Sequence, residues 1–179
     1  MSHQRKGNYK TLKDEWETPD WLFALLDREF DFRVDAAARK HNTKTGLYFE
    51  DALSVDWRHF NSLESGGIEP SYFLNPPYSA GNITRFMKKA YEESLKGAVV
   101  VCLVPVASDT AWWHNYVMKA DEIRFIQGRV KFIGYDDQGN PIKNSPTFSS
   151  CVVIFREMYK KRFTPYIGKT IEQSRKVPA

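Results

Sequence analysis

One stretch of the chain decides its fold: Ser71-Tyr72-Phe73-Leu74-Asn75-Pro76-Pro77-Tyr78. Its first four residues follow a Gly- and Ser-rich loop over residues 62–70, and this setting is typical of a strand. The two prolines cannot donate to a ladder, so the strand ends at Asn75. The sequence therefore predicts a strand that presents Asn75 at its carboxyl end.

Helical and extended patterns alternate on both sides of this stretch. Helices are expected over about Pro19–Glu29, Ile83–Lys96 and Thr110–Ala120, and further strands over Phe32–Asp35, Leu47–Phe49, Ala98–Val104, Ile123–Ile126, Val130–Ile133 and Cys151–Phe155. A turn-rich segment at 136–141 lies between the last two strands and suggests a hairpin. This order predicts an α/β fold with a mostly parallel sheet and an antiparallel edge hairpin.

Length and charge predict one domain with a basic end. The 179 residues, 42% of them hydrophobic, suffice for a single core. We expect a mobile segment over 1–15, the domain over 16–158 and a basic tail over 159–179. Residues 150–179 hold seven Lys/Arg and two acidic residues, within a net charge of +4. Such a tail can contact phosphates or simply remain solvated.

The two cysteines point to neither a metal site nor a disulfide. Cys102 and Cys151 lie in apolar runs that read as core strands, without zinc-ligand spacing. No metal is therefore expected. The start of the chain lacks an apolar signal region, and no apolar run is long enough to span a membrane. These features predict a soluble cytoplasmic protein.

Candidate ligand groups follow three of the expected strands. In open α/β sheets, ligands bind beyond the carboxyl ends of the strands, where Asp35, Asp51 and Asn75 fall. A carboxylate there can hold an ammonium group, a ribose hydroxyl or an adenine amine. The small residues Ala36–Ala38 allow a tight turn or a close approach to a ligand. Asp51, taken alone, also fits an exposed acid or a helix cap.

The residues Asn75, Pro76, Pro77 and Tyr78 suit catalysis on an amino group. The Asn75 side-chain oxygen and the Pro76 carbonyl can accept hydrogen bonds from one NH2 group, favouring the pyramidal nitrogen of a transition state over the planar ground state. Tyr78 offers an aromatic face on which a base drawn out of a duplex can stack. The alternative is an ordinary turn with a packed tyrosine.

Other positions are candidates for contacts with the substrate. Asp109 follows an expected strand end and precedes Trp112, Trp113 and His114, for which a helix cap and core aromatics are the simpler interpretation. Phe148 is a candidate for the second wall of a base pocket. Arg129 follows Gly128 at the start of an expected strand and could hold a phosphate, or be merely exposed.

Four segments together resemble the short phage-encoded DNA N-6-adenine methyltransferase family: Trp16-Glu17-Thr18-Pro19, Val34-Asp35-Ala36-Ala37-Ala38, Glu50-Asp51-Ala52-Leu53 with Trp57, and Asn75-Pro76-Pro77-Tyr78. The resemblance runs from about Trp16 to Phe155. It implies a compressed, Rossmann-like methyltransferase fold. It also implies an enzyme that transfers a methyl group from S-adenosylmethionine (SAM) to the N6 amine of adenine in double-stranded DNA, after flipping the base out.

The same resemblance implies roles for individual residues. Thr18, in the motif with Pro19, would contact the SAM carboxylate, and Asp35, followed by Ala36, its ammonium group. Asp51, followed by Ala52, would contact the SAM adenine. Asn75 with Pro76 would bind the target amine, within a catalytic loop that includes Pro77 and Tyr78, while Phe148 and Asp109 join Tyr78 as substrate-binding candidates.

The chain departs from larger relatives in its SAM-binding region. Ala36-Ala37-Ala38-Arg39 replaces their glycine-rich turn, and only sixteen positions separate Asp35 from Asp51. Asn42 is a candidate for the ribose contact or a turn former. Two other functions remain open: a protein-glutamine N5 methyltransferase, whose substrate has a similar planar NH2 group, and a non-catalytic DNA-binding protein of the same fold.

Overall fold

The computed structural model describes residues 16–57, 70–79, 81–135, 141–144, 146–156 and 162–167. The predicted mobile segment at 1–15, the loop at 62–69 and the turn at 136–140 lie outside these residues. Side-chain surroundings are described for 16–57, 70–79, 81–134 and 146–156. These ranges contain every predicted site residue.

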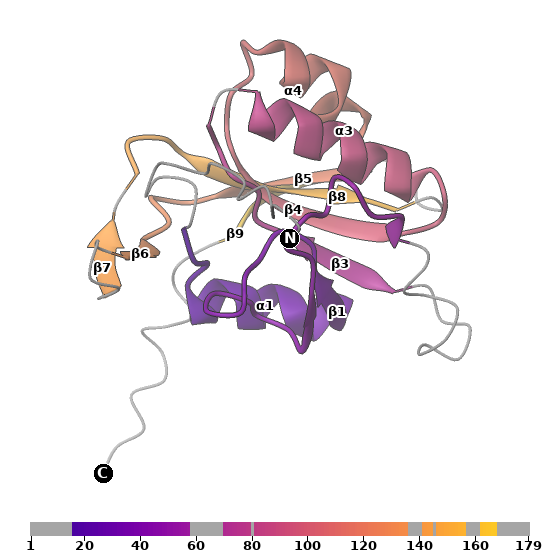
Figure 1. Ribbon diagram of the computed structural model, residues 1–179. Coiled ribbons are helices and arrows are strands. Elements are labelled where there is room, and N and C mark those ends of the chain that lie inside the picture. The colour runs from indigo at the N-terminus through magenta and orange to yellow at the C-terminus, as the bar shows by residue number, and fades with distance from the viewer. Residues whose placement is uncertain are drawn as a thin grey trace, which may run out of the picture.

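A seven-stranded sheet forms the centre of the molecule (Figure 1). Its strands, in spatial order, are β2 (Leu47–Tyr48), β1 (Phe32–Asp35), β3 (Ser71–Leu74), β4 (Val99–Pro105), β8 (Ser150–Phe155), β5 (Glu122–Ile126) and β9 (Arg162–Ile167). Parallel ladders join β2, β1, β3 and β4, and another joins β5 to β9. Only β8 runs antiparallel to its two neighbours.

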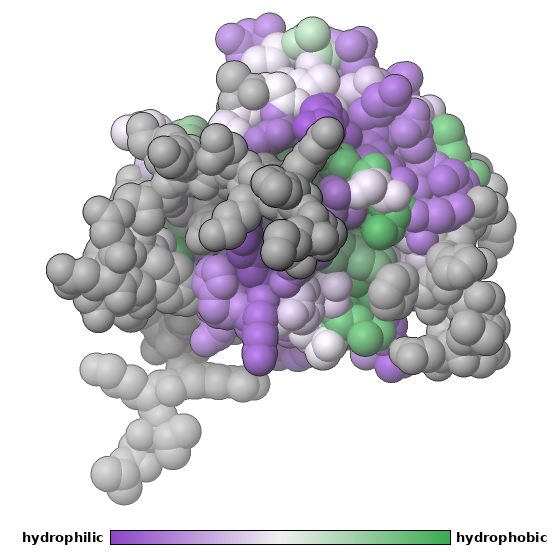
Figure 2. Space-filling view, in the orientation of Figure 1, coloured by the Kyte–Doolittle hydropathy of each residue, from purple (hydrophilic) through white to green (hydrophobic). Residues whose placement is uncertain are grey.

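Helices cover both faces of this sheet (Figure 1). The helix α1 (Asp20–Phe30) lies below it, and α3 (Asn82–Ser94) and α4 (Ala111–Asn115) lie above it. A short 3₁₀ helix, η2 (Val117–Lys119), follows α4. Buried residues recur on α3 at Ile83, Phe86, Met87 and Ala90, the spacing of one helical face. The outer surface over α3 and α4 is mostly hydrophilic (Figure 2).

Alternating residues of the strands build two hydrophobic cores. On β3, Tyr72 and Leu74 join the cluster beneath α3 and α4, whereas Phe73 joins the cluster against α1. The successive residues 100–104 of β4 are all buried, because both faces of the strand are covered. This explains why the sequence of β4 is continuously apolar.

The predicted fold class is confirmed, while some pairings differ from the expectation. The strand expected at Val130–Ile133 is β6 (Phe132–Tyr135), and it pairs with β7 (Pro141–Asn144) in a separate two-stranded hairpin. It does not pair with residues 151–155, which belong to β8 inside the main sheet. The sequence of β8 is apolar because this strand is buried between β4 and β5. A strand of an edge hairpin would not need to be buried in this way.

Part of the predicted basic tail belongs to the sheet. Residues 162–167, which fall within the expected tail 159–179, form β9 and pair with β5. Residues 159–161 and 168–179 lie outside the described structure. The positive charge of this segment favoured its interpretation as a tail, although residues 162–167 form a strand. The prediction of a tail is therefore wrong over these residues.

Candidate active site

Two of the predicted ligand groups lie at the same edge of the sheet. β1 and β3 are parallel neighbours, with Asp35 in register with Phe73. Beyond this pair, the Ala36 amide donates to the Phe73 carbonyl at 2.7 Å. Asn75 follows one residue after the end of β3. The carboxyl ends of the two strands therefore bring Asp35 and Asn75 to one edge, as predicted.

Asp35 is buried, and within the described part of the chain no cation is bonded directly to it. Its side chain accepts hydrogen bonds from the backbone amides of Ala37, at 3.4 Å, and Lys44, at 3.1 Å. Burial raises the pKa of Asp35 to about 6, against the smaller opposing effects of these hydrogen bonds and the Lys44 charge. A carboxylate in this setting would be stabilised by a bound cationic group.

Lys44 ties the segment after β1 to the start of α1. Its ammonium group lies 2.5 Å from a Glu17 carboxylate oxygen and 2.6 Å from one of Asp20. Burial alone would lower the pKa of Lys44, but the hydrogen bonds to Asp20 and Glu17 raise it above its usual value. Lys44 therefore stays charged. Its ammonium group contacts Glu17 and Asp20, while its backbone amide donates a hydrogen bond to Asp35.

Thr18 lies in the turn that Lys44 anchors. The helix α1 begins one residue later than expected, at Asp20, and Pro19 occupies the N-cap position with its carbonyl accepting from Leu22 and Phe23. Thr18 therefore does not cap the helix. Its side-chain oxygen is buried without a hydrogen-bond partner, and the residue is only 2% exposed. A buried hydroxyl in this state is a ready partner for a polar ligand.

Asn75 is held at both ends of its side-chain amide. Its Nδ2 donates to the Trp16 carbonyl at 2.7 Å, and its Oδ1 accepts from the Tyr78 hydroxyl at 2.7 Å. The hydroxyl also lies 3.0 Å from the Leu103 carbonyl. Burial raises the pKa of Tyr78 well above its usual value, so the hydroxyl remains a donor. The second lone pair of Oδ1 is left to accept from an N–H donor.

Three aromatic rings contact Tyr78 in the loop at residues 75–78. The Tyr78 ring meets Trp16, Phe132 and Phe148 edge-on, with centroid distances of 6.0, 6.1 and 5.6 Å. The predicted proximity of Phe148 to Tyr78 is thus observed. The sequence analysis did not single out Phe132, and quoted Trp16 only as part of a motif. The apolar ring at 132 gave no signal of its own, because it resembles any core strand residue.

Asp51 and Ala52 lie in the segment after β2. Asp51 is exposed and its carboxylate accepts from the Ser54 hydroxyl. The Ala52 side chain is buried, and its carbonyl accepts from the Trp57 indole at 2.9 Å. Asp51 is therefore accessible to a ligand, whereas Ala52 anchors the segment in the core.

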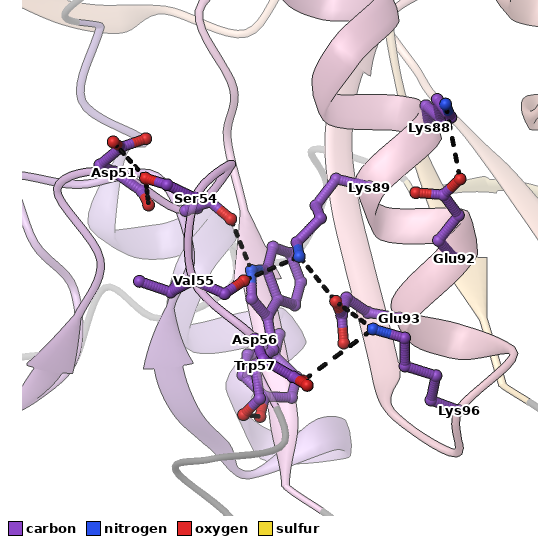
Figure 3. A network of polar contacts seen from close by, with 12 residues as sticks. Asp51, Ser54, Val55, Asp56, Trp57, Lys88, Lys89, Glu92, Glu93 and Lys96 are labelled. Atoms are coloured by element: carbon purple, nitrogen blue, oxygen red, sulfur yellow. Dashed lines mark hydrogen bonds and ion pairs between the residues drawn. The ribbon is translucent and has the colours of Figure 1, made fainter.

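A network of charged residues fastens this segment to α3 (Figure 3). Lys89 Nζ lies 2.7 Å from the Val55 carbonyl and 2.7 Å from the fully buried Glu93 carboxylate. Lys96 lies 2.9 Å from Glu93 and 3.9 Å from Asp56. These contacts fix the backbone that carries Asp51 relative to the long helix.

The other candidates divide between surface and core. Asp109 is exposed between β4 and α4, and Arg129 is exposed as well. Trp112 and Trp113 are buried in the core, as the simpler interpretation held. Asn42 accepts from the Arg39 amide at 2.7 Å, which is the geometry of a turn former.

No group of three or more His, Cys, Asp or Glu in the described ranges is placed to hold a metal ion. In the same part of the chain, no helix has both the length and the apolar character needed to cross a bilayer.

Fold and site together define a Rossmann-like α/β methyltransferase, with a buried carboxylate and a fixed asparagine amide at adjoining strand ends. The chain belongs to the DNA N-6-adenine-methyltransferase (Dam) family, whose model matches residues 6–176. It is accordingly an adenine-N6 DNA methyltransferase.

Two relatives carry the same name, DNA N-6-adenine-methyltransferase. The protein of Haemophilus phage HP1 is 32% identical over 148 residues, covering 76% of this chain and 79% of the relative. The protein of Escherichia phage T1 is 29% identical over 117 residues, covering 65% of this chain and 46% of that longer relative. Both names specify DNA and adenine, which favours this substrate over a protein glutamine.

Proposed function

We propose that the chain transfers a methyl group from SAM to the N6 amine of an adenine flipped out of double-stranded DNA. The observation that carries this proposal is the double anchoring of Asn75 beside the strand that ends in Asp35. The anchoring fixes which way the amide oxygen faces, since only this orientation satisfies both the Trp16 carbonyl and the Tyr78 hydroxyl.

The residues near the end of β1 fit the amino-acid part of SAM. Asp35 is a buried carboxylate whose observed partners are two backbone amides, so an ammonium group would supply the missing positive charge. The unpaired Thr18 hydroxyl could donate to a carboxylate. We further propose that exposed Asp51 holds the adenine of the cofactor. When bound, SAM supplies an electrophilic methyl group on a sulfonium centre.

The chain's own residues would then act on the target amine. An aromatic amine is a weak nucleophile because its lone pair is delocalised into the ring. Asn75 Oδ1 and the Pro76 carbonyl would each accept one N–H hydrogen bond and so favour the pyramidal nitrogen that attacks the methyl group. Pro76 and Pro77 keep the loop rigid. After transfer the methylated nitrogen is strongly acidic and passes its extra proton to water, so no strongly basic side chain is needed at this step.

Base flipping follows from the position of the loop. Adenine N6 inside a duplex cannot reach an amide held beside buried rings, so the base must leave its stack. Tyr78 and Phe148 would form walls of the pocket that receives it, and exposed Asp109 would contact the substrate nearby.

The proposal is tested by measuring methylated nucleosides. The full chain is expressed in cells that lack adenine methylation, and their DNA is digested and searched for N6-methyladenine. The purified protein is assayed with SAM labelled in the methyl group on duplex and single-stranded DNA. Label in N6-methyladenine that disappears in Asn75→Ala is the expected result. Label in protein glutamine, or binding of DNA without any transfer, would establish one of the two alternatives.

A further inference from the structure

Trp16 occupies the middle of an aromatic stack beside the catalytic loop. Its indole stacks on Phe132 with a centroid distance of 5.3 Å and an interplanar angle of 29°. It also stacks on Phe148, at 5.7 Å and 20°. Among the described rings, Phe132 and Phe148 contact Trp16 and Tyr78 but not each other. The indole therefore fills a slot between two phenyl rings.

The ring system that fills this slot has the shape of a purine. Indole and adenine are both planar, with a six-membered ring fused to a five-membered ring, and planar bases readily stack on aromatic side chains. Tyr78 closes one side of the slot, because its ring stands at 88° to the indole. The slot also adjoins the reacting groups, since the Trp16 carbonyl accepts from Asn75 at 2.7 Å.

The indole of Trp16 and the backbone beside it are held by different contacts. The neighbouring residue, Glu17, exchanges two backbone hydrogen bonds with Ile133, at 2.8 and 3.1 Å. The Trp16 side chain, by contrast, is held by ring contacts and remains partly exposed. Rotation about its side-chain torsions would empty the slot while leaving the backbone contacts with Ile133 and Asn75 intact.

We propose that the slot between Phe132 and Phe148 is the site of the extrahelical adenine, and that the Trp16 indole occupies it until the base displaces it. This inference rests on the proposed base flipping. It assigns Phe132 as a wall of the base pocket and Trp16 as the residue that occupies this pocket in the absence of DNA. Its backbone carbonyl keeps Asn75 oriented in both states.

Tryptophan emission reports directly on the displacement. The protein is saturated with S-adenosylhomocysteine, to prevent turnover, and titrated with a duplex containing the sequence that the wild type methylates. The matched duplex carries an abasic site in place of the target adenine. The contribution of Trp16 is the difference between the wild type and Trp16→Phe. The control is Trp21→Phe, which removes a partly buried tryptophan of α1 that has no ring contact with the stack.

The expected result is a shift of Trp16 emission to longer wavelength and stronger quenching by acrylamide with the adenine duplex. The abasic duplex should produce neither change, and Trp21→Phe should respond like the wild type. Weaker acrylamide quenching without a red shift would show that the indole stays in place as a wall under the stacked base. That outcome, or no change in emission, would overturn the proposal.

A binding measurement tests the same idea independently. Trp16→Ala should bind the adenine duplex about three- to tenfold more tightly than the wild type, because the base no longer has to break the two ring stacks. Affinity for the abasic duplex should not change. Weaker binding of the adenine duplex would contradict the displacement. Failure of the proposed function is a separate result, since the wild type would then form no N6-methyladenine.

Discussion

Replacing Asp35 with asparagine should alter the pH dependence of folding stability in a predictable direction. Burial raises the pKa of Asp35 from 3.8 to about 6. Because the folded state holds this proton more tightly than the unfolded state, stability is fully present below the unfolded pKa and is lost as the pH rises through about 6. The difference of about two pK units corresponds to about 3 kcal/mol at neutral pH.

The measurement is the free energy of urea unfolding of wild type and Asp35→Asn, without ligand, at several pH values. Asparagine offers an NH2 group to one of the two backbone amides that Asp35 accepts, and this mismatch adds a loss that does not depend on pH. The informative quantity is therefore how the difference in unfolding free energy between the wild type and Asp35→Asn changes with pH. Between about pH 5 and about pH 8, the unfolding free energy of Asp35→Asn should rise by about 1.4 kcal/mol relative to that of the wild type.

Calorimetric titration with SAM completes the test. Asp35→Asn should bind SAM more weakly, because the anionic partner of the ammonium group is lost. Wild-type affinity should fall as the pH drops below about 6, where Asp35 becomes protonated, by at most about tenfold per pH unit. A stability difference that is constant with pH, or an unchanged SAM affinity in the variant, would refute this assignment of Asp35.

Three further predictions concern catalysis and DNA binding. Asn75→Ala should lower kcat at least about a hundredfold, because it removes an acceptor for the target amine, and leave the SAM dissociation constant unchanged by calorimetry; normal turnover would contradict this. Tyr78→Phe keeps the ring but loses the hydrogen bond to Asn75 Oδ1. The kcat should therefore fall about two- to tenfold, with little change in KM for DNA. A rise in KM alone would mean that the hydroxyl only helps binding. Deleting residues 168–179 leaves β9 in place and removes three Lys/Arg and one acid. The plot of log affinity for DNA against log salt concentration should become shallower by about one to two units of slope, without a change in the methylated sequence. An unaltered slope would show that the tail is solvated.

The local elements were predictable because their patterns are strong. The helix over Asn82–Ser94 and the strand over Val99–Pro105 lie within two residues of their expected bounds. The strand ends at Asp35 and Asn75 were also correctly located, since an acid and a pair of prolines interrupt apolar runs there. Ligand groups at strand ends follow from these local signals and one general rule of α/β sheets.

The long-range pairings were less predictable because apolar strands carry little information about their neighbours. β8 is buried on both faces, so its sequence fits the middle of the sheet as well as an edge hairpin. Lys44 and Phe132 were missed for a related reason. Their roles depend on Glu17 and Trp16, which lie 27 and 116 positions away along the chain.

We propose that one ligand meets two buried polar groups, Thr18 and Asp35, whose segments are linked by the contacts of Lys44. Thr18 leaves its hydroxyl unpaired while Pro19 caps the helix, and Asp35 carries a charge that burial disfavours. Each arrangement costs about 1–3 kcal/mol in the folded chain, and valine in place of threonine would avoid much of the cost at position 18. Lys44 shows that the same region pairs a buried charge fully when structure requires it. An α-amino acid group, with one carboxylate and one ammonium, offers a hydrogen-bond acceptor to the Thr18 hydroxyl and a positive charge to the Asp35 carboxylate.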